Sequence, residues 1–510
     1  MSFPPDYSYP WLPDEGDGTY RNPVLHADYS DPDVIRVGTE YWMTASSFTA
    51  TPGLPLLRST DLINWKLVGH AIRQVPHPSY AAVRPGCGVW APSLREHAGR
   101  FWIFFPMPDE GIYATVADHP AGPWEEPWLV QAAVGWIDPC PFWDDDGTAW
   151  LFHAFANSRA GKRDRLHVRP MSPDGRTLLG EGFEIVYAPH HPYLEGPKVH
   201  KRDGWYYVMA PGGGVPTGWQ VAYRSRRLTG PYEERIVLAR GSTAINGPHQ
   251  GAFVDTPDND WWFVHFQDTG PFGRITHLQP VLWPTGDDWP QVGFISVPDA
   301  VGEPVSGTKS ALLKQGGPRF APVDSDEFEA GFLGPQWQWQ ANHNPAWADF
   351  VGRPGWLRLL AMVPHPEKLE LTPHLLTQKF PARSFTVETM IEITGSVSAG
   401  LVVTGGASSA CLQLCSVTTA RRLVYSIENR PVFECDAPGV PSRLRVTVNS
   451  SGECTFAYAD ASGAYTNLAE IFTAREGGWM GAKVGLFANG ESGHADFDYF
   501  RFHGATPSSR

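Results

Sequence analysis

The sequence contains few charged residues and has no surplus of basic ones. Only 18% of the 510 residues are charged, and the formal net charge is -14 at pH 7. Proteins that bind nucleic acids or anionic membranes in general carry an excess of positive charge. The composition therefore disfavours both as partners.

Long apolar runs are absent and cysteine is scarce. No stretch reaches the roughly 18 apolar residues that suggest a transmembrane helix. The N-terminus, Met1-Ser-Phe-Pro-Pro-Asp-Tyr-Ser8, lacks the basic start and apolar core of a secretory signal. The six cysteines have no CxxC spacing, and free thiols in a cytoplasmic enzyme are their simplest explanation. A signal peptide removed from a precursor would leave no trace in this sequence. The cysteines are Cys87, Cys140, Cys411, Cys415, Cys435 and Cys454.

Aromatic residues, glycine and proline are abundant instead. Aromatics make up 13% of the chain, including 21 Trp, and there are 52 Gly and 48 Pro. This composition is typical of an all-β protein with many turns and an aromatic-lined binding surface. The length exceeds that of one ordinary domain, so we expect two or three.

A hairpin pattern recurs along the first part of the chain. Each copy has an apolar strand, a charged or Gly-containing turn and a second strand rich in aromatics, and the copies follow one another about every 50–60 residues. They centre on Trp42, Trp102, Trp150, Tyr206 and Trp262. Five such units predict a five-bladed β-propeller over residues 23–300. An array of β-sandwiches is the alternative, which the even spacing disfavours.

The pattern stops near residue 300 and a second one follows. Residues 1–22 are polar and Pro-rich and are interpreted as an N-terminal arm, and residues 301–322 as a Gly/Pro/Lys-rich linker. Residues 323–505 contain short alternating strands separated by regular turns, which predicts a β-sandwich domain of concanavalin-like type.

Three acidic residues stand beside prolines at the start of three hairpin units. Asp31 precedes Pro32, Asp138 precedes Pro139, and Glu195 precedes Gly196-Pro197. We expect Pro32 to hold Asp31 in extended geometry. Taken singly, each acid would be interpreted as a turn residue. Innermost strands of a propeller begin near its axis, however, so the three should converge, and three unpaired carboxylates would be costly to bury without a function.

Carboxylates among aromatic walls indicate glycoside cleavage. One acid must be neutral to protonate the leaving oxygen, and nearby like charges raise its pKa. Another must be ionised to activate water, and the third can tune and orient the others.

Six motifs in this order resemble glycoside hydrolase family 43. The motifs are Ser30-Asp-Pro-Asp33, Trp90-Ala-Pro-Ser93, Ile137-Asp-Pro139, Leu194-Glu-Gly-Pro197, Gly247-Pro-His-Gln-Gly251 and Gly273-Arg274. The resemblance implies a five-bladed propeller with a C-terminal β-sandwich and an inverting mechanism. It implies that Asp31 is the general base, Asp138 the pKa modulator and orienter, and Glu195 the general acid. Many β-xylosidases of this family have Gly-Arg-Glu where this chain has Gly273-Arg274-Ile275, which leaves the leaving-group preference open.

Four further residues are candidates for substrate binding. Phe48 and Trp90 would stack on sugar faces, or pack in the core. Arg274 would bind sugar hydroxyls and bias the pKa values of the acids, or form a structural ion pair. Trp219 follows a Gly-rich loop and is a weaker candidate for the mouth of the site. His249 begins the fifth unit and alone reads as a polar core residue; the resemblance implies that it binds substrate and holds a hydrated Ca²⁺ or another divalent cation at the propeller centre.

The sequence therefore predicts an inverting, exo-acting glycoside hydrolase that releases β-D-xylose, or α-L-arabinofuranose, from xylan-derived oligosaccharides. Inversion requires the Asp31 and Glu195 carboxyls to lie roughly 6.5–9.5 Å apart. We expect the sandwich to wall off one side of the funnel and favour chain ends. The alternatives are an arabinan-degrading hydrolase and an inactive carbohydrate-binding protein, which should have lost one of the acids. The oligomeric state stays open.

Overall fold

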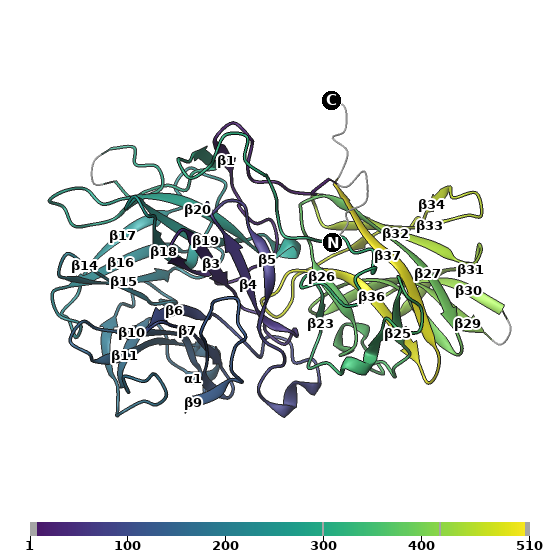
Figure 1. The fold of residues 1–510 in the computed structure, drawn as a ribbon, viewed down its shortest axis with the longest axis horizontal. Coiled ribbons are helices and arrows are strands. Elements are labelled where there is room, and N and C mark those ends of the chain that lie inside the picture. Colours follow the sequence, from purple (N-terminus) through teal and green to yellow (C-terminus); the bar gives the residue numbers. More distant parts are fainter. Residues whose placement is uncertain (1–7, 298–299, 418–419, 505–510) are drawn as a thin grey trace.

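The computed structural model describes residues 8–297, 300–417 and 420–504, which form two β-rich bodies side by side (Figure 1). The first is a five-bladed propeller and the second a β-sandwich, so the predicted fold class is confirmed. Within the described residues, no helix is both long and apolar enough to cross a membrane.

Each propeller blade is a four-stranded antiparallel sheet built from one continuous stretch of chain. In blade order the strands are β2 (Asp33–Val37), β3 (Glu40–Thr44), β4 (Gly53–Ser59) and β5 (Lys66–Ile72); β6 (Ser93–His97), β7 (Arg100–Met107), β8 (Gly111–Ala117) and β9 (Trp128–Ala132); β10 (Trp136–Trp143), β11 (Ala149–Phe155), β12 (Arg165–Met171) and β13 (Phe183–Tyr187); β14 (Lys198–Arg202), β15 (Trp205–Gly212), β16 (Trp219–Ser225) and β17 (Glu233–Ala239); β18 (His249–Asp255), β19 (Trp261–Asp268), β20 (Arg274–Leu282) and β21 (Gln291–Val292).

The aromatic residues that marked the hairpins all lie on the second strand of their blades. In β3, the consecutive side chains of Tyr41, Trp42 and Met43 are all buried, because neighbouring blades cover both faces of the sheet. This two-sided burial explains why the second strands read as apolar and aromatic runs rather than as alternating patterns. Short helical turns complete the propeller: η1 (Pro78–Ala81), α1 (Asn157–Ala160) and η2 (Gly270–Phe272).

The ring closes at a seam between the fifth and first blades, over which the described part of the N-terminal arm, residues 8–22, lies; residues 1–7 of the predicted arm lie outside the described residues. Strand β1 (Thr19–Arg21) of the arm pairs with β22 (Gly307–Lys309), which lies in the stretch interpreted as a linker. The Leu25 and Thr276 backbones exchange hydrogen bonds of 3.3 and 3.0 Å. An ion pair of 2.6 Å between Arg36 and Asp255 joins the innermost strands of the two blades.

The second domain consists of two stacked sheets. One has the order β23-β26-β36-β28-β29-β30-β31, and the other β24-β25-β37-β27-β32-β33-β34, with β35 paired to β33. Their large apolar core includes Phe385, Leu444 and Phe500. The elements are β23 (Gln338–Trp339), η3 (Pro345–Trp347), β24 (Ala348–Asp349), β25 (Leu357–Leu360), η4 (Leu369–Leu371), β26 (Leu376–Lys379), β27 (Phe385–Thr394), β28 (Val397–Gly405), β29 (Ser408–Val417), β30 (Ala420–Ile427), β31 (Arg430–Asp436), β32 (Ser442–Val448), β33 (Glu453–Ala459), β34 (Tyr465–Asn467), β35 (Phe472–Thr473), β36 (Lys483–Gly490) and β37 (His494–Gly504).

The two domains share backbone hydrogen bonds. Thr51 of the first blade and Trp339 of β23 exchange bonds of 3.0 and 2.7 Å. The loop of residues 474–482, between β35 and β36, reaches across to the propeller: Gly481 N–H donates to Asp28 Oδ2 at 2.9 Å, and Ala482 N–H donates to the carbonyl of Pro271 at 2.8 Å. This sandwich loop is therefore anchored beside the seam of the ring.

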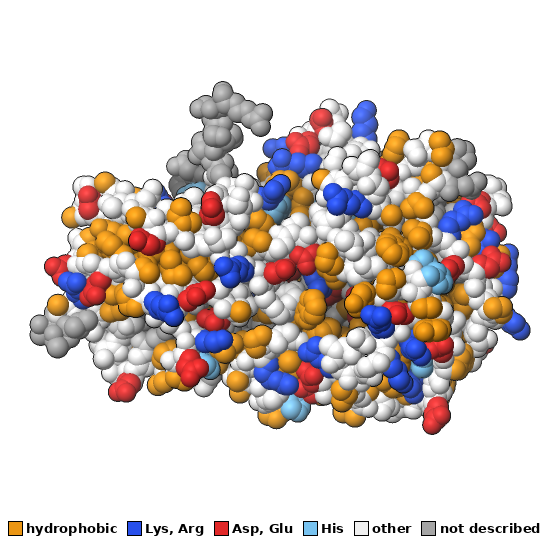
Figure 2. Space-filling view, turned by 180° about the vertical axis from the view of Figure 1, so that it is seen from behind, with side chains coloured by type: hydrophobic (Ala, Val, Ile, Leu, Met, Phe, Trp, Pro, Cys, Tyr) orange, Lys and Arg blue, Asp and Glu red, His pale blue; other side chains and the backbone are white. Residues whose placement is uncertain are grey.

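The surface of the molecule mixes side chains of all kinds. On the face shown in Figure 2, acidic, basic and hydrophobic residues are interspersed over both domains. No single kind of side chain dominates this face.

Candidate active site

A cavity of about 360 Å³ opens where the innermost strands begin, and it brings the three predicted acids together. Asp31, Asp138 and Glu195 all line it. They come from three blades, and each lies at or just before an innermost strand. The remaining lining residues are Phe48, Trp90, Ala91, Ile137, Tyr193, Gly214, Val215, Pro216, Gln250, Arg274 and Trp479.

Asp31 does not have the extended geometry that we expected from Pro32. Its φ is +55°, in the left-handed region, so the preference of a residue before proline is overridden here. Three donors hold the carboxylate in this position. Ser30 Oγ and Ser46 Oγ donate to Oδ2 at 2.7 and 2.6 Å, and Arg274 Nη1 donates to Oδ1 at 3.2 Å. Such a set of donors suits an ionised, acceptor-only carboxylate.

Asp138 lies inside β10, at an irregularity in its pairing with β11 between Ile137 and Cys140. Its φ is +56°, and such bulges re-aim side chains near functional sites. Gly196 N–H donates to Asp138 Oδ2 at 2.7 Å, which ties the residue to the backbone beside Glu195. Burial and the neighbouring Asp31 charge raise the pKa of Asp138 to about 7.

Glu195 lies in the loop before β14, where its backbone N–H donates to the carbonyl of Pro211 at 3.1 Å. Its side chain is 25% exposed and reaches the cavity. Burial, followed by the charges of Asp138 and Asp31, raises its pKa well above the usual value, while Arg274 opposes the shift. Among the three acids, Glu195 thus has the environment that suits a proton donor.

Both predicted aromatic residues line the cavity, and two further ones were missed. Phe48 is buried and Trp90 half-buried, with ring centroids 6.4 Å apart. Tyr193 and Trp479 are 48% and 53% exposed although they border the same cavity. Trp479 belongs to the sandwich loop, and its ring lies 6.4 Å from that of Trp90 in an edge-on arrangement.

The backbone of Trp479 is in an unusual conformation. Its φ is +72°, which is rare for a bulky residue and is typically maintained by the surrounding structure at functional sites. Gly478 is in close contact with Gly86, and Gly481 with Gly273, since an added Cβ would come within 2.7 and 2.6 Å of their backbone nitrogens. A tryptophan flanked by glycines, in Gly477-Gly-Trp-Met-Gly481, is the signal in the sequence that could have identified this wall.

Arg274 forms a structural ion pair, as in one of the two alternatives considered for it, and it also lines the cavity. It pairs with Asp31, and its Nη1 also donates to Ser30 Oγ at 3.0 Å. Its guanidinium carbon lies 4.8 Å from the ring centre of Phe266 and 5.8 Å from that of Trp479. Arg274 is thus both a structural ion-pair partner and part of the cavity wall. The neighbouring Ile275 is buried.

The proposal that Trp219 lines the mouth is wrong. Trp219 is not among the residues that border the cavity, and its indole N–H donates to His191 Nδ1 at 3.0 Å. The preceding loop residues Val215 and Pro216 line the cavity in its place.

One group of three possible metal ligands is found in the described part of the chain: His190, His191 and Glu234. The hydrogen bond from the Trp219 indole to His191 argues against a metal there. The indole always donates, so Nδ1 of His191 must accept, and Nε2 of the neutral ring then carries the proton. A metal at Nε2 would need the opposite tautomer. The contact of 3.6 Å between Nε2 and Glu234 is consistent with an N–H facing a carboxylate.

His249 is the first residue of β18 and is fully buried; unlike its neighbour Gln250, it is not among the residues that line the cavity, so its predicted contact with substrate is not seen. Within the described residues, neither ring nitrogen has a hydrogen-bond partner, and Nε2 lies 3.6 Å from Glu195 Oε1. Burial, with smaller effects of Arg274 and His265, lowers its pKa to about 3, so a lone pair is available. No described group of three ligands includes His249. These residues therefore fit only a cation that keeps most of its water shell.

The chain was compared with known families and proteins. Residues 20–290 match the family described as Glycosyl hydrolases family 43, and residues 325–503 match the Beta xylosidase C-terminal Concanavalin A-like domain. A protein of Xylanibacter ruminicola whose name includes beta-xylosidase is 45% identical over 396 residues, covering 77% of this chain and 72% of its own. The Beta-xylosidase of Formosa agariphila is 31% identical over 556 residues, covering 96% and 91%.

A solved structure has the same two-domain fold. A family 43 protein from Bacillus licheniformis aligns with a TM-score of 0.82 at 24% identity, covering 95% of this chain and 100% of that one. The family match spans more than half of the chain and includes all three acids, and the Formosa relative is similar over nearly the full length. The chain therefore belongs to glycoside hydrolase family 43 and is a glycosidase.

Proposed function

We propose that the enzyme is an inverting, exo-acting pentosidase that removes a terminal β-D-xylose from xylan-derived oligosaccharides. The observation that carries the proposal is the cavity of about 360 Å³ lined by three carboxyl groups in different environments. Glu195 has a strongly raised pKa, Asp138 titrates at about 7, and Asp31 is surrounded by donors.

These environments support the following roles. Glu195 holds a proton and gives it to the glycosidic oxygen as the bond to the anomeric carbon breaks. Asp31 accepts a proton from a water molecule, whose oxygen forms the new bond on the opposite face of the sugar. Asp138 contacts neither reacting oxygen in this scheme. Its negative charge, close to Glu195, keeps the proton on that group.

The exo preference is supported by the origin of the walls. Trp479 comes from the sandwich, while Trp90 and Tyr193 come from the propeller, and all three border the cavity. A pocket bounded by both domains accepts a chain end more readily than the middle of a polymer. Aromatic faces at this rim suit the C–H surfaces of pyranose rings.

An α-L-arabinofuranoside is the second candidate substrate. It is favoured by one relative, the Non-reducing end alpha-L-arabinofuranosidase of Bacteroides ovatus, which is 26% identical over 528 residues and covers 95% of this chain. Ile275, which is buried, stands where many β-xylosidases have a glutamate, so the leaving-group preference stays open for either sugar.

The test combines product stereochemistry with substrate preference. A proton NMR time course on a nitrophenyl β-D-xyloside should show α-xylose first, and initial β-xylose would refute inversion. Parallel assays on nitrophenyl β-D-xyloside and α-L-arabinofuranoside would decide the sugar. A rapid fall in the viscosity of polymeric xylan would refute the exo assignment.

A hydrated divalent cation next to His249 is part of the same proposal. Its support is the buried, unpartnered imidazole 3.6 Å from Glu195. A bound cation would supply fixed positive charge near that carboxyl group. Because no described group of three ligands includes His249, the ion would keep most of its water, and His249 would contact it directly or through that water shell.

A further inference from the structure

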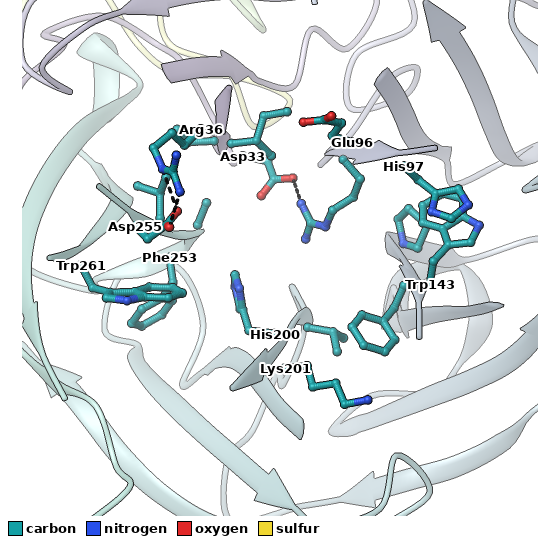
Figure 3. Close-up of a pocket in the computed structure, with 18 residues that line it drawn as sticks. Asp33, Arg36, Glu96, His97, Trp143, His200, Lys201, Phe253, Asp255 and Trp261 are labelled. Carbon is teal, nitrogen blue, oxygen red and sulfur yellow. Dashed lines mark hydrogen bonds and ion pairs between the residues drawn. The ribbon is translucent and has the colours of Figure 1, made fainter. Parts of the chain in front are cut away.

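A second cavity, of about 370 Å³, lies at the opposite end of the propeller axis. The innermost strands begin at the candidate active site and run away from it, and the later residues of all five line this far cavity. They include Arg36 of β2, His97 of β6, Trp143 of β10, Lys201 of β14 and Asp255 of β18. Figure 3 shows these side chains arranged around one central space.

The basic groups of the far cavity are already paired. Arg36 donates to both carboxylate oxygens of Asp255, at 3.2 and 2.6 Å. Arg95 donates to Asp33 at 2.7 Å. Lys201 is paired with Asp144. Because their charges are compensated, these groups leave little positive charge for an anionic ligand.

Other polar atoms near the far cavity lack hydrogen bonds within the described structure. His200 Nε2 and Trp261 Nε1 are buried without one, and Asp33 Oδ1 has only an ion-pair contact of 3.7 Å with Lys198 Nζ. Figure 3 shows the His200 ring pointing from its strand into the central space. Burial lowers the pKa of His200 to about 4, so the ring is neutral. Unpaired buried polar groups are costly, and a ligand that both donates and accepts hydrogen bonds would satisfy them.

Aromatic surfaces complete the wall. His97 stacks on Trp143 with ring centroids 4.3 Å apart and an interplanar angle of 7°. Phe253 and Trp261 flank His200, with ring centroids 6.2 and 6.1 Å from it. A neutral wall that combines flat apolar faces with free donors and acceptors suits a hydroxyl-rich molecule.

We propose that the far cavity binds a neutral saccharide, a pentose or a short pentose oligomer. Its volume of about 370 Å³ is close to the 360 Å³ of the candidate active site. The choice of pentose rests on the proposed function, whereas the preference for a neutral, hydroxyl-rich ligand rests on the far cavity alone. The enzyme would then hold two sugar ligands, one at each end of the propeller axis.

Equilibrium dialysis of radiolabelled xylobiose against the full-length Asp31→Asn protein, which should not hydrolyse it, tests this proposal. We expect two sites per chain. His200→Phe retains a ring against Phe253 and Trp261 but removes the hydrogen-bonding nitrogens, so it should weaken one site at least tenfold. The matched substitution His503→Phe, at an exposed histidine of β37, should leave both sites intact.

Two further measurements separate the outcomes. With His200→Phe in the otherwise native enzyme, an unchanged rate of nitrophenyl xyloside hydrolysis would show that the variant folds; if it misfolds, Glu96→Gln at the rim of the same cavity replaces it. Binding at a site sensitive to His200, without hydrolysis by the native enzyme, would refute the proposed function and support the far site. The proposal would be overturned if xylobiose bound at a single site that neither His200→Phe nor Glu96→Gln weakens. Displacement of xylobiose from the far site by inorganic phosphate would also overturn it.

Discussion

Replacing Glu195 by glutamine should make the enzyme dependent on the leaving group. Glutamine keeps the size of the side chain but cannot transfer a proton to the glycosidic oxygen. The native group is suited to this step because burial, Asp138 and Asp31 together raise its pKa. Substrates with poor leaving groups should therefore lose most of their rate, and activated ones little.

The size of the effect follows from general acid catalysis. A positioned acid contributes about 10²–10⁴-fold, which corresponds to about 3–5 kcal/mol of transition-state stabilisation. We expect kcat/KM on xylobiose to fall by this amount in Glu195→Gln. On a dinitrophenyl glycoside, whose leaving group needs little protonation, we expect a fall of about tenfold or less.

The assay compares kcat/KM for the two substrates in the native enzyme, in Glu195→Gln and in a control. Glu370→Gln is a matched control, since Glu370 is a buried glutamate of the sandwich that accepts from Ser409 at 3.0 Å. The ratio of the two rates should change only in the Glu195 variant. Equal losses on both substrates would refute the assignment of Glu195 as the acid.

Four other changes test the rest of the site. Asp31→Asn should reduce hydrolysis of every substrate by at least 10³-fold, because no base would activate water, and a surviving rate on dinitrophenyl glycosides would contradict this role. Asp138→Asn removes a charge that raises the pKa of Glu195, so the alkaline limb of the pH–rate profile should move to lower pH; an unmoved limb would exclude modulation. Chelation should lower the melting temperature or activity, with recovery on adding Ca²⁺, if a cation binds at His249. Trp479→Ala should raise KM for xylobiose about tenfold, and equal KM values would show that the sandwich does not contact substrate.

The sequence predicted the blades because the signal that defines them is local. A turn followed by an aromatic strand, as at Trp42, depends on neighbouring residues and repeats with each blade. The meeting of Asp31, Asp138 and Glu195 could be inferred only through the propeller topology, which brings the starts of distant strands to one axis.

The missed features depend on long-range contacts. The left-handed φ of Asp31 is held by Ser46 and by Arg274, which lies far along the chain, and these contacts override the local rule for a residue before proline. Trp479 reaches the cavity from a different domain. Trp219 was misassigned because its partner, His191, is not apparent from the adjacent sequence.

The seam of the ring has a consequence for folding of the enzyme during its synthesis on the ribosome. Asp31 lies on the first blade side of the seam and its partner Arg274 on the fifth, and β22 fastens the N-terminal arm only after residue 307 has emerged. Domains fold largely as their residues emerge during synthesis. The first four blades must therefore remain an open arc until the fifth blade has been synthesised. During this time the apolar faces that the closed ring covers are exposed. Chaperone demand and aggregation during expression should concentrate in this interval, and early truncations should accumulate as insoluble protein rather than as smaller active enzymes.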